Sequence, residues 1–226
     1  KLDKKNIEAA VEGSLKRLNT DYIDLYQLHW PDRPLNIFGG GLGAYKHYDL
    51  ESIEISETLE VLSEIVETGK VRNIALSNET PWGLSEFINK SEMLNFPRVQ
   101  SVQNAYNLLN RTYEYGMSEF AHRSSVGLLA YSPLAQGYLS GKYLNGAMPK
   151  GSRTQLFGRG QRYETPSAEK SIQAYVDYAE KIGMDPSVMA NAFVNSREFV
   201  TSNIIGATTM EPVSYTHLRA HETRHY

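Results

Sequence analysis

Polar side chains that can form hydrogen bonds recur where predicted strands end. They are His29, Ser77, Asn78, Gln103, Tyr131 and Ser132, with the run Gly206-Ala207-Thr208 after the last strand. Imidazole, hydroxyl and amide groups can both donate and accept hydrogen bonds. In (β/α)8 barrels the chemistry is carried by residues at the carboxyl ends of several different strands. This pattern therefore favours one polar site at one end of a barrel.

Apolar periodicity divides the chain into alternating strands and helices. Strands are predicted at 22–28, 71–77, 99–105, 126–131 and 202–206. Helices are predicted after Asp3 as N-cap, around 59–66 with Gly69 ending the helix, and at 82–93, 117–122, 168–182 and 186–196. The Gly-rich segments 38–43 and 140–165 are predicted as loops. Five strands joined by mostly short helical connections predict an α/β fold with a parallel sheet.

A doubly wound sheet would also accommodate five such strands. That fold binds a dinucleotide at a G-x-G-x-x-G turn after a strand, and no such turn follows any predicted strand here. The polar strand ends favour the barrel instead.

The composition is that of an ordinary globular protein, with 226 residues of which 41% are hydrophobic and 22% charged. A net charge of -3 gives no reason to expect nucleic acid or an anionic membrane as partner. No apolar run approaches the roughly 20 residues of a membrane span, and the polar N-terminal residues show no signal peptide. Because the chain has no Cys, disulfides and thiolate catalysis are excluded, and we expect a cytoplasmic location.

Several strings resemble the aldo-keto reductase family, and most of all its bacterial Tas-type members. The family-level strings are Ser14-Leu15-Lys16-Arg17-Leu18, Asp21-Tyr22-Ile23-Asp24-Leu25-Tyr26-Gln27-Leu28-His29-Trp30-Pro31, Gly69-Lys70-Val71-Arg72, Leu76-Ser77-Asn78-Glu79 and Ala130-Tyr131-Ser132-Pro133-Leu134. The Tas-type strings are Leu108-Leu109-Asn110-Arg111, Gly141-Lys142-Tyr143-Leu144-Asn145-Gly146 and Gly206-Ala207-Thr208-Thr209-Met210. The resemblance covers about residues 3–211 in order.

The resemblance implies an eight-stranded TIM (β/α)8 barrel that binds NADPH and passes hydride to an aldehyde or ketone without a metal. Residues 1–211 would form a partial barrel from strand 4 to strand 8. The Asp, Tyr and Lys of the family's catalytic set would lie on strands that precede residue 1. We therefore expect the chain to be aggregation-prone and without turnover, since an incomplete barrel leaves open edges.

Roles for individual residues follow from the same resemblance. His29 matches the catalytic histidine that orients the substrate carbonyl; the alternative is a strand-end histidine satisfied by backbone. Ser77, Asn78 and Gln103 match the residues that bind the nicotinamide carboxamide, and Tyr131 matches the aromatic that stacks on the ring. The remaining cofactor-binding matches are Ser132, Leu134 and Gly137 at the pyrophosphate, Lys142, Ser152 and Arg153 in a phosphate clamp with Arg159 and Arg162, and Gly206, Thr208 and Thr209 near the 2′-phosphate.

The tail 212–226 resembles no part of the family and is predicted to be non-native sequence. It contains His221-Glu222-Thr223-Arg224-His225, a formal match to the H-E-x-x-H zinc signature, with His217 one turn earlier. A zinc site needs these side chains on one ordered helix beside a pocket, so we expect no metal site here.

A second functional hypothesis is a regulatory barrel, like the potassium-channel β subunits, which resemble this chain in the Ser152-Arg153 loop and bind the same cofactor. That hypothesis predicts tetrameric assembly and an exposed docking surface. The Tas-type strings favour the reductase, with a small-molecule carbonyl compound as substrate. The insertion 31–56 is the candidate for shaping the substrate pocket.

Overall fold

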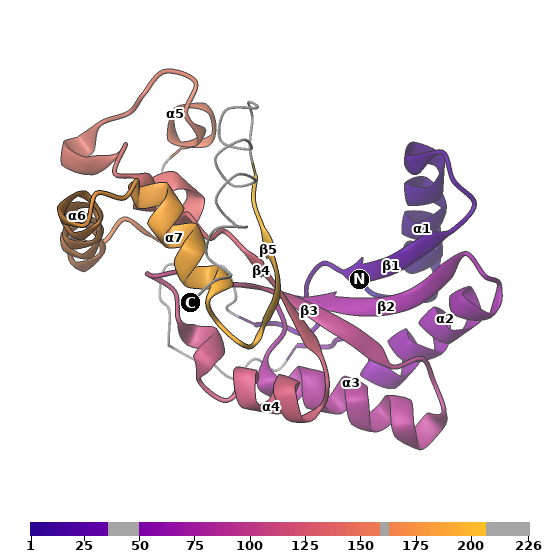
Figure 1. Cartoon of the computed structure of the whole chain (residues 1–226). Coiled ribbons are helices and arrows are strands. Elements are labelled where there is room, and N and C mark those ends of the chain that lie inside the picture. The colour runs from indigo at the N-terminus through magenta and orange to yellow at the C-terminus, as the bar shows by residue number, and fades with distance from the viewer. Residues whose placement is uncertain (36–49, 159–162, 207–226) are drawn as a thin grey trace. The chain divides into compact units, whose positions relative to one another are not determined.

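The computed structural model describes residues 1–35, 50–158 and 163–206. Within these ranges helices and strands alternate along the chain (Figure 1). The strands are β1 (Ile23–Leu28), β2 (Val71–Ser77), β3 (Val99–Ala105), β4 (Gly127–Tyr131) and β5 (Val200–Ile204). The helices are α1 (Lys4–Leu18), α2 (Ile55–Glu67), α3 (Pro81–Leu94), α4 (Met117–Arg123), α5 (Arg153–Phe157), α6 (Pro166–Lys181) and α7 (Pro186–Asn195), with 3-10 turns η1 (Thr112–Glu114), η2 (Ala135–Ser140) and η3 (Leu144–Gly146).

The strands form one sheet in the order β1-β2-β3-β4-β5, so each strand neighbours the next along the chain. The registers of β1 with β2 and of β2 with β3 are parallel. A doubly wound sheet reverses its strand order at a switch point, whereas a (β/α)8 barrel adds strands consecutively. The consecutive order confirms the predicted α/β fold of a partial TIM barrel.

Two compact units make up the chain, and each is described by itself. The first comprises residues 1–37, 43–104 and 114–128, and the second residues 38–42, 105–113 and 129–226, so that their boundary passes through β4.

The first unit has a core of aliphatic side chains between strands and helices. Helix α1 contributes one apolar stripe at helical spacing, Ile7, Val11 and Leu15. Its start is fixed by Asp3, whose carboxylate accepts a hydrogen bond from the N–H of Asn6 at 2.9 Å, as predicted. In Figure 1, α2, α3 and α4 follow one another along the same side of β2 and β3. These helices thereby cover β2 and β3 on that side.

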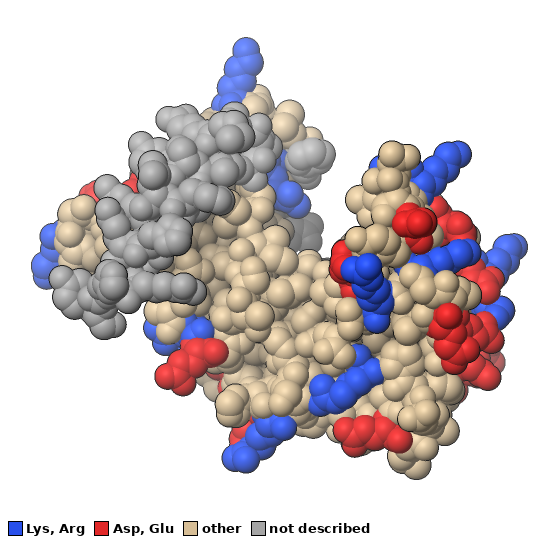
Figure 2. Space-filling model, turned by 45° about the vertical axis from the view of Figure 1, so that its right-hand side comes forward, with Lys and Arg blue, Asp and Glu red and all other residues tan. Residues whose placement is uncertain are grey.

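Charged side chains of both signs intermix on the face of the molecule that Figure 2 shows. Ion pairs in the first unit include Arg72 with Asp24, Lys70 with Glu12, and Lys4 with Glu64. The partners in these pairs are all exposed, and exposed pairs contribute little to stability because water screens them. The buried aliphatic core is therefore the main stabilising feature of this unit.

The second unit is built around aromatic side chains. Its core consists of Ala135, Tyr138, Leu139, Tyr143, Tyr163, Ile172, Val176 and Ala190. A separate aromatic group packs beside it: Tyr106 stacks on Phe193 at a centroid distance of 5.7 Å and meets Phe199 edge-on at 5.2 Å. These contacts hold α7, through Phe193, and the segment that follows it, through Phe199, against Tyr106.

Two predictions about secondary structure are wrong in detail. The segment 140–165 is not all loop, because Ser152 begins the short helix α5 and a 3-10 turn forms at Leu144–Gly146. The last strand is Val200–Ile204, two residues earlier than predicted, since the β-branched pair Val200-Thr201 extends it backwards.

Candidate cofactor site

Strand register brings three predicted site residues together in the first unit. Ser77 at the end of β2 lies opposite Gln103 on β3. Because Leu28 pairs with Leu76, His29 lies level with Ser77. The carboxyl ends of β1, β2 and β3 therefore present these residues side by side.

Hydrogen bonds tie these strand ends to one another. The Ser77 hydroxyl donates to the Gln103 carbonyl at 2.7 Å, and the Asn78 N–H donates to the same oxygen at 3.0 Å. The Asn78 side-chain amide donates to the His29 carbonyl at 2.9 Å. Ser77 and Asn78 are buried, whereas His29 is exposed and Gln103 is half-buried. The Ser77 hydroxyl and the Asn78 amide are thus held between the Gln103 backbone and the His29 carbonyl, beside an accessible imidazole.

Asn78 has the left-handed φ of 55°, which Asn tolerates better than most residues because its short polar side chain bonds locally. The turn directs its amide back toward β1, where it meets His29. The His29 ring also packs against Trp30, with 4.1 Å between ring centroids. The strand-end turn is thus what joins the β1 and β2 positions.

Two further polar residues of this cluster, Gln27 and Asn104, were not predicted from the sequence. The Gln27 side-chain amide donates to the Gln103 side-chain oxygen at 3.2 Å, and its own side-chain oxygen is buried without a hydrogen-bond partner among the described residues. Asn104 holds the backbone of Glu79 at both ends, accepting from its N–H at 3.0 Å and donating to its carbonyl at 2.8 Å. Gln27 could have been found from the sequence, since it stands on the same strand face as His29, two residues away.

The second unit contains the predicted loop after β4. Ser132 has a positive φ of 58°, and its carbonyl accepts from the side chain of Asn107 at 2.8 Å. Two tight turns follow, closed by the N–H of Ala135 to the Ser132 carbonyl at 2.9 Å and the N–H of Gly137 to the Leu134 carbonyl at 2.8 Å. The loop is therefore held in one conformation by its own backbone and by Asn107.

Gly137 in this loop lies directly against Lys142. Its φ of 98° is a conformation that L side chains rarely adopt, and a Cβ there would come within 3.0 Å of Lys142 Cε. The ammonium group of Lys142 is thus held beside a Gly whose backbone a ligand can approach closely. Phosphate groups are bound in this way, by a cation together with turn backbone.

Ser152 is the N-cap residue of α5 and is buried, while Arg153 beside it is exposed. The Ser152 and Thr154 hydroxyls lie 3.2 Å apart. The Tyr143 hydroxyl forms no hydrogen bond of standard geometry among the described residues, yet its pKa is lowered. Burial acts against that shift, and the Thr154 and Ser152 hydroxyls with the charge of Lys142 outweigh it. The Ser152 turn is thereby linked to the Lys142 segment.

Two other predicted residues of the second unit lie at strand ends, Tyr131 at the end of β4 and Gly206 after β5. Tyr131 is half-buried at the end of β4, and its carbonyl accepts from the N–H of Tyr106 at 3.2 Å. Gly206 is exposed after β5. Outside the described residues lie Thr208, Thr209, Arg159, Arg162, most of the insertion 31–56, and the whole tail with His217, His221 and His225.

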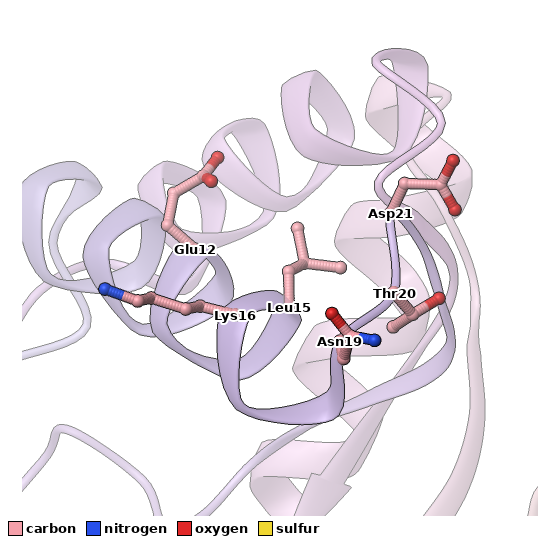
Figure 3. Close-up of a pocket in the computed structure, with 6 residues that line it drawn as sticks. All are labelled: Glu12, Leu15, Lys16, Asn19, Thr20 and Asp21. Carbon is pink, nitrogen blue, oxygen red and sulfur yellow. The ribbon is translucent and has the colours of Figure 1, made fainter.

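A surface hollow in the first unit lies at the opposite end of the strands. It is lined by residues at the end of α1 and in the turn before β1: Glu12, Leu15, Lys16, Asn19, Thr20 and Asp21 (Figure 3). In barrels the amino-terminal ends of the strands serve stability, and ligands bind at the other end. We therefore place the candidate site at the carboxyl ends.

The described ranges contain no cluster of three or more His, Asp or Glu side chains able to hold a metal ion. They also contain no helix that is both long and apolar enough to cross a membrane.

Known proteins resemble this chain along most of its length. The model of the aldo/keto reductase family matches residues 1–216. The protein tas of Escherichia coli strain K12 is 47% identical over 210 residues, which cover 93% of this chain and 60% of that protein. An aldo-keto reductase of Babesia bovis is 39% identical over 220 residues, covering 92% of this chain and 77% of the relative. The L-glyceraldehyde 3-phosphate reductase of E. coli K12 is 29% identical over 214 residues, covering 92% and 56%.

The chain thus spans about 60% of the length of the Tas proteins that it matches. The matched range contains the five strands of the described residues and all the predicted site residues up to Thr209. The resemblance inferred from the sequence, including its Tas-type character, is confirmed: the chain belongs to the aldo/keto reductase family.

Proposed function

We propose that this chain forms the cofactor-binding part of an NADPH-dependent reductase of aldehydes or ketones. The observation that carries the proposal is the hydrogen-bonded cluster of Ser77, Asn78 and Gln103 beside the accessible His29. Family membership and relatives with reductase names support the reaction class.

The first unit fits the nicotinamide carboxamide, which needs hydrogen-bond donors and acceptors together. Ser77, Asn78 and Gln103 provide both, and the unpartnered oxygen of Gln27 lies next to Gln103. When bound, the reduced nicotinamide would supply the hydride. His29 would donate a hydrogen bond to the substrate carbonyl, orienting it and favouring the negative charge that develops on its oxygen.

The second unit fits the rest of the cofactor. Tyr131 would stack on the nicotinamide ring, and the backbone of Ser132, Leu134 and Gly137 would approach the pyrophosphate. Lys142, Ser152 and Arg153 would bind phosphate, with Arg giving two parallel hydrogen bonds. Gly206, Thr208 and Thr209 would begin the 2′-phosphate site, on which the preference for NADPH over NADH depends. At the pyrophosphate position, a Cβ on Gly137 would press on the Lys142 side chain, so a Gly there suits a close approach of phosphate to this cation.

A binding titration tests the proposal on the chain as it is. Nicotinamide fluorescence of NADPH is followed as protein is added, for the wild type and for Gln103→Ala. Without the Gln103 amide, its hydrogen bonds to the carboxamide are lost. The free energy of NADPH binding is then expected to weaken by about 1–1.5 kcal/mol, which is about tenfold in Kd. Gln100→Ala is the matched control, because Gln100 is an exposed residue of the same type on the same strand.

The proposal expects saturable binding of NADPH, a roughly tenfold loss for Gln103→Ala and no change for Gln100→Ala. Absence of saturable binding by the wild type, or equal losses for both variants, would refute it. We also propose that the 226 residues show no carbonyl-dependent oxidation of NADPH, since the resemblance assigns the tyrosine and lysine of the catalytic set elsewhere. Robust turnover by the purified chain would contradict that second proposal.

A further inference from the structure

A largely buried ion pair involves Glu79, the residue that follows Asn78 of the candidate carboxamide site. Arg33, in the loop after β1, is paired with Glu79, in the turn after β2, and their side chains are 16% and 2% exposed. Arg33 Nη1 donates to Glu79 Oε2 at 3.1 Å, and Nη2 donates to Thr80 Oγ1 at 3.0 Å. The Arg33 guanidinium also lies over the Trp82 ring, 5.0 Å from its centroid. The loop after His29 is thus fastened to the start of α3.

Stability alone is a poor explanation for such a pair. Removing two charges from water costs free energy that their attraction often fails to recover, and a pair of apolar side chains of similar size usually stabilises as well. What a buried pair does provide is a fixed geometry, because each charge must keep its partner. The pair therefore acts chiefly by holding Glu79 in one position.

Glu79 is fixed at every polar atom. Asn104 holds its N–H and its carbonyl, and its carboxylate accepts from Arg33 and from the N–H of Thr80 at 2.6 Å. Gly83 on the next helical turn leaves the space for this carboxylate, because a Cβ at Gly83 would overlap both Glu79 and Arg33. Because all its polar atoms are held, Glu79 also restricts the backbone positions of the residues next to it.

The neighbour on the amino side is Asn78, with its left-handed φ of 55°. Ser77 before it is held by the Gln103 carbonyl, and Glu79 after it is held by Asn104 and Arg33. The Asn78 amide in turn holds the carbonyl of His29, which lies four residues before Arg33. The ion pair therefore closes a ring of contacts that includes both the amide cluster and the imidazole-bearing strand end.

We propose that Glu79, held by Arg33 and Asn104, is a positioning residue that fixes Asn78 and the His29 strand end for binding the nicotinamide ring. This inference rests on the proposed function, because it assumes that Ser77, Asn78 and Gln103 meet the carboxamide. It assigns a role to three residues that do not themselves touch the cofactor.

Two ligands separate positioning from folding. NADPH carries the nicotinamide ring, whereas adenosine 2′,5′-bisphosphate is the adenosine part of the same cofactor without it. The variant Glu79→Gln keeps the shape of the side chain and removes its charge. We expect its affinity for NADPH to fall about tenfold and its affinity for the bisphosphate to stay within twofold of wild type. Amide hydrogen exchange at residues 77–80 is expected to become faster in the same variant, without any ligand.

The matched control is Asp24→Asn. Asp24 accepts from Arg72 Nη1 at 2.6 Å, and Arg72 lies over the Tyr22 ring at 3.8 Å, so the contacts copy those of Arg33. This pair is exposed, at 56% for Arg72 and 72% for Asp24, and lies near the amino ends of the strands. We expect Asp24→Asn to change neither the affinity for NADPH or the bisphosphate nor the rate of amide hydrogen exchange at residues 77–80.

A double variant controls for the loss of stability that an unpaired buried charge would cause by itself. Arg33→Gln combined with Glu79→Gln leaves no buried charge, so its stability is expected to recover while the NADPH defect persists. Unchanged NADPH affinity in Glu79→Gln overturns the inference, and so does an equal loss of both ligands or recovery of NADPH binding in the double variant. A wild-type chain that binds the bisphosphate as tightly as NADPH instead refutes the proposed function, and the inference with it.

Discussion

Gly83→Ala is expected to destabilise the chain even though Gly83 lies in a helix. Ala is intrinsically better than Gly in a helix by up to about 1 kcal/mol, so propensity alone predicts a gain. Gly83 is buried in the first turn of α3, and an added Cβ would overlap Arg33 Nη2 and Glu79 Oε1. The Glu79 side chain is 2% exposed and the Arg33 side chain 16%, so both have less freedom to move away than an exposed side chain has.

The expected magnitude follows from the two opposing effects. Forcing an extra methyl group into a packed site typically costs about 1–3 kcal/mol. Set against the gain of up to about 1 kcal/mol from propensity, the net effect is a loss of about 1–2 kcal/mol. Gly13 in α1 gives the matched comparison, because a Cβ there meets the end of the exposed Arg17 side chain at 3.1 Å. Arg17 can move away, so Gly13→Ala is expected to stabilise by up to about 1 kcal/mol.

Urea unfolding followed by circular dichroism measures both variants. A further variant sharpens the test: in a Glu79→Ala background the carboxylate is gone, so adding Gly83→Ala should cost at least about 1 kcal/mol less than it does in the wild type. Gly83→Ala that is as stable as Gly13→Ala would refute the geometry of the Arg33–Glu79 pair, and with it the basis for the positioning role of Glu79.

Three other outcomes are expected. Asn107→Ala should destabilise the second unit by about 2 kcal/mol, measured by urea unfolding, because Asn107 is fully buried and its amide holds the Ser132 carbonyl. Tyr113→Phe should be as stable as wild type at pH 7, since the buried Tyr113 hydroxyl has no hydrogen-bond partner among the described residues. Burial raises the pKa of Tyr113 above its ordinary 10.0, so its contribution is complete below pH 10 and is lost as pH rises further; between pH 10 and 11 the wild type should lose about 1 kcal/mol relative to Phe. Gly137→Ala should weaken NADPH binding in a fluorescence titration by at least tenfold, because Ala disfavours a φ of 98° and presses on Lys142.

Local sequence patterns predicted the elements well where one physical rule dominates. β2 and β3 have the predicted bounds; β2 lies between the turn residues Gly69 and Asn78, and β3 begins directly after Pro97-Arg98. Strand order could also be inferred, since short helical connections leave consecutive parallel strands as neighbours. The helix α5 was missed because it is only one turn long and lies in a Gly-rich segment that hides its periodicity.

The strand-end residues were predicted from their polar pattern and their roles from the family resemblance, and the register explains why several of them meet. Ser77 lies opposite Gln103 because the pairing of β2 with β3 shifts register between Ile74 and Leu76. No sequence pattern indicates this shift. The Arg33–Glu79 pair was missed because its partners are 46 residues apart and each, taken alone, is typical of a solvated loop. Long-range pairing of this kind becomes visible once the strands are in register.

The most direct test of the account maps the nicotinamide cofactor onto the chain residue by residue. Backbone amide resonances of the 15N-labelled protein are followed by NMR while NADP+ is added. We expect saturable shifts at Ser77, Asn78 and Gln103 together with the segment 131–137, and no shifts in the hollow around Lys16 at the other end of the strands. Shifts confined to that hollow, or no saturable shift at any strand end, would contradict the claim that these polar strand ends bind the cofactor.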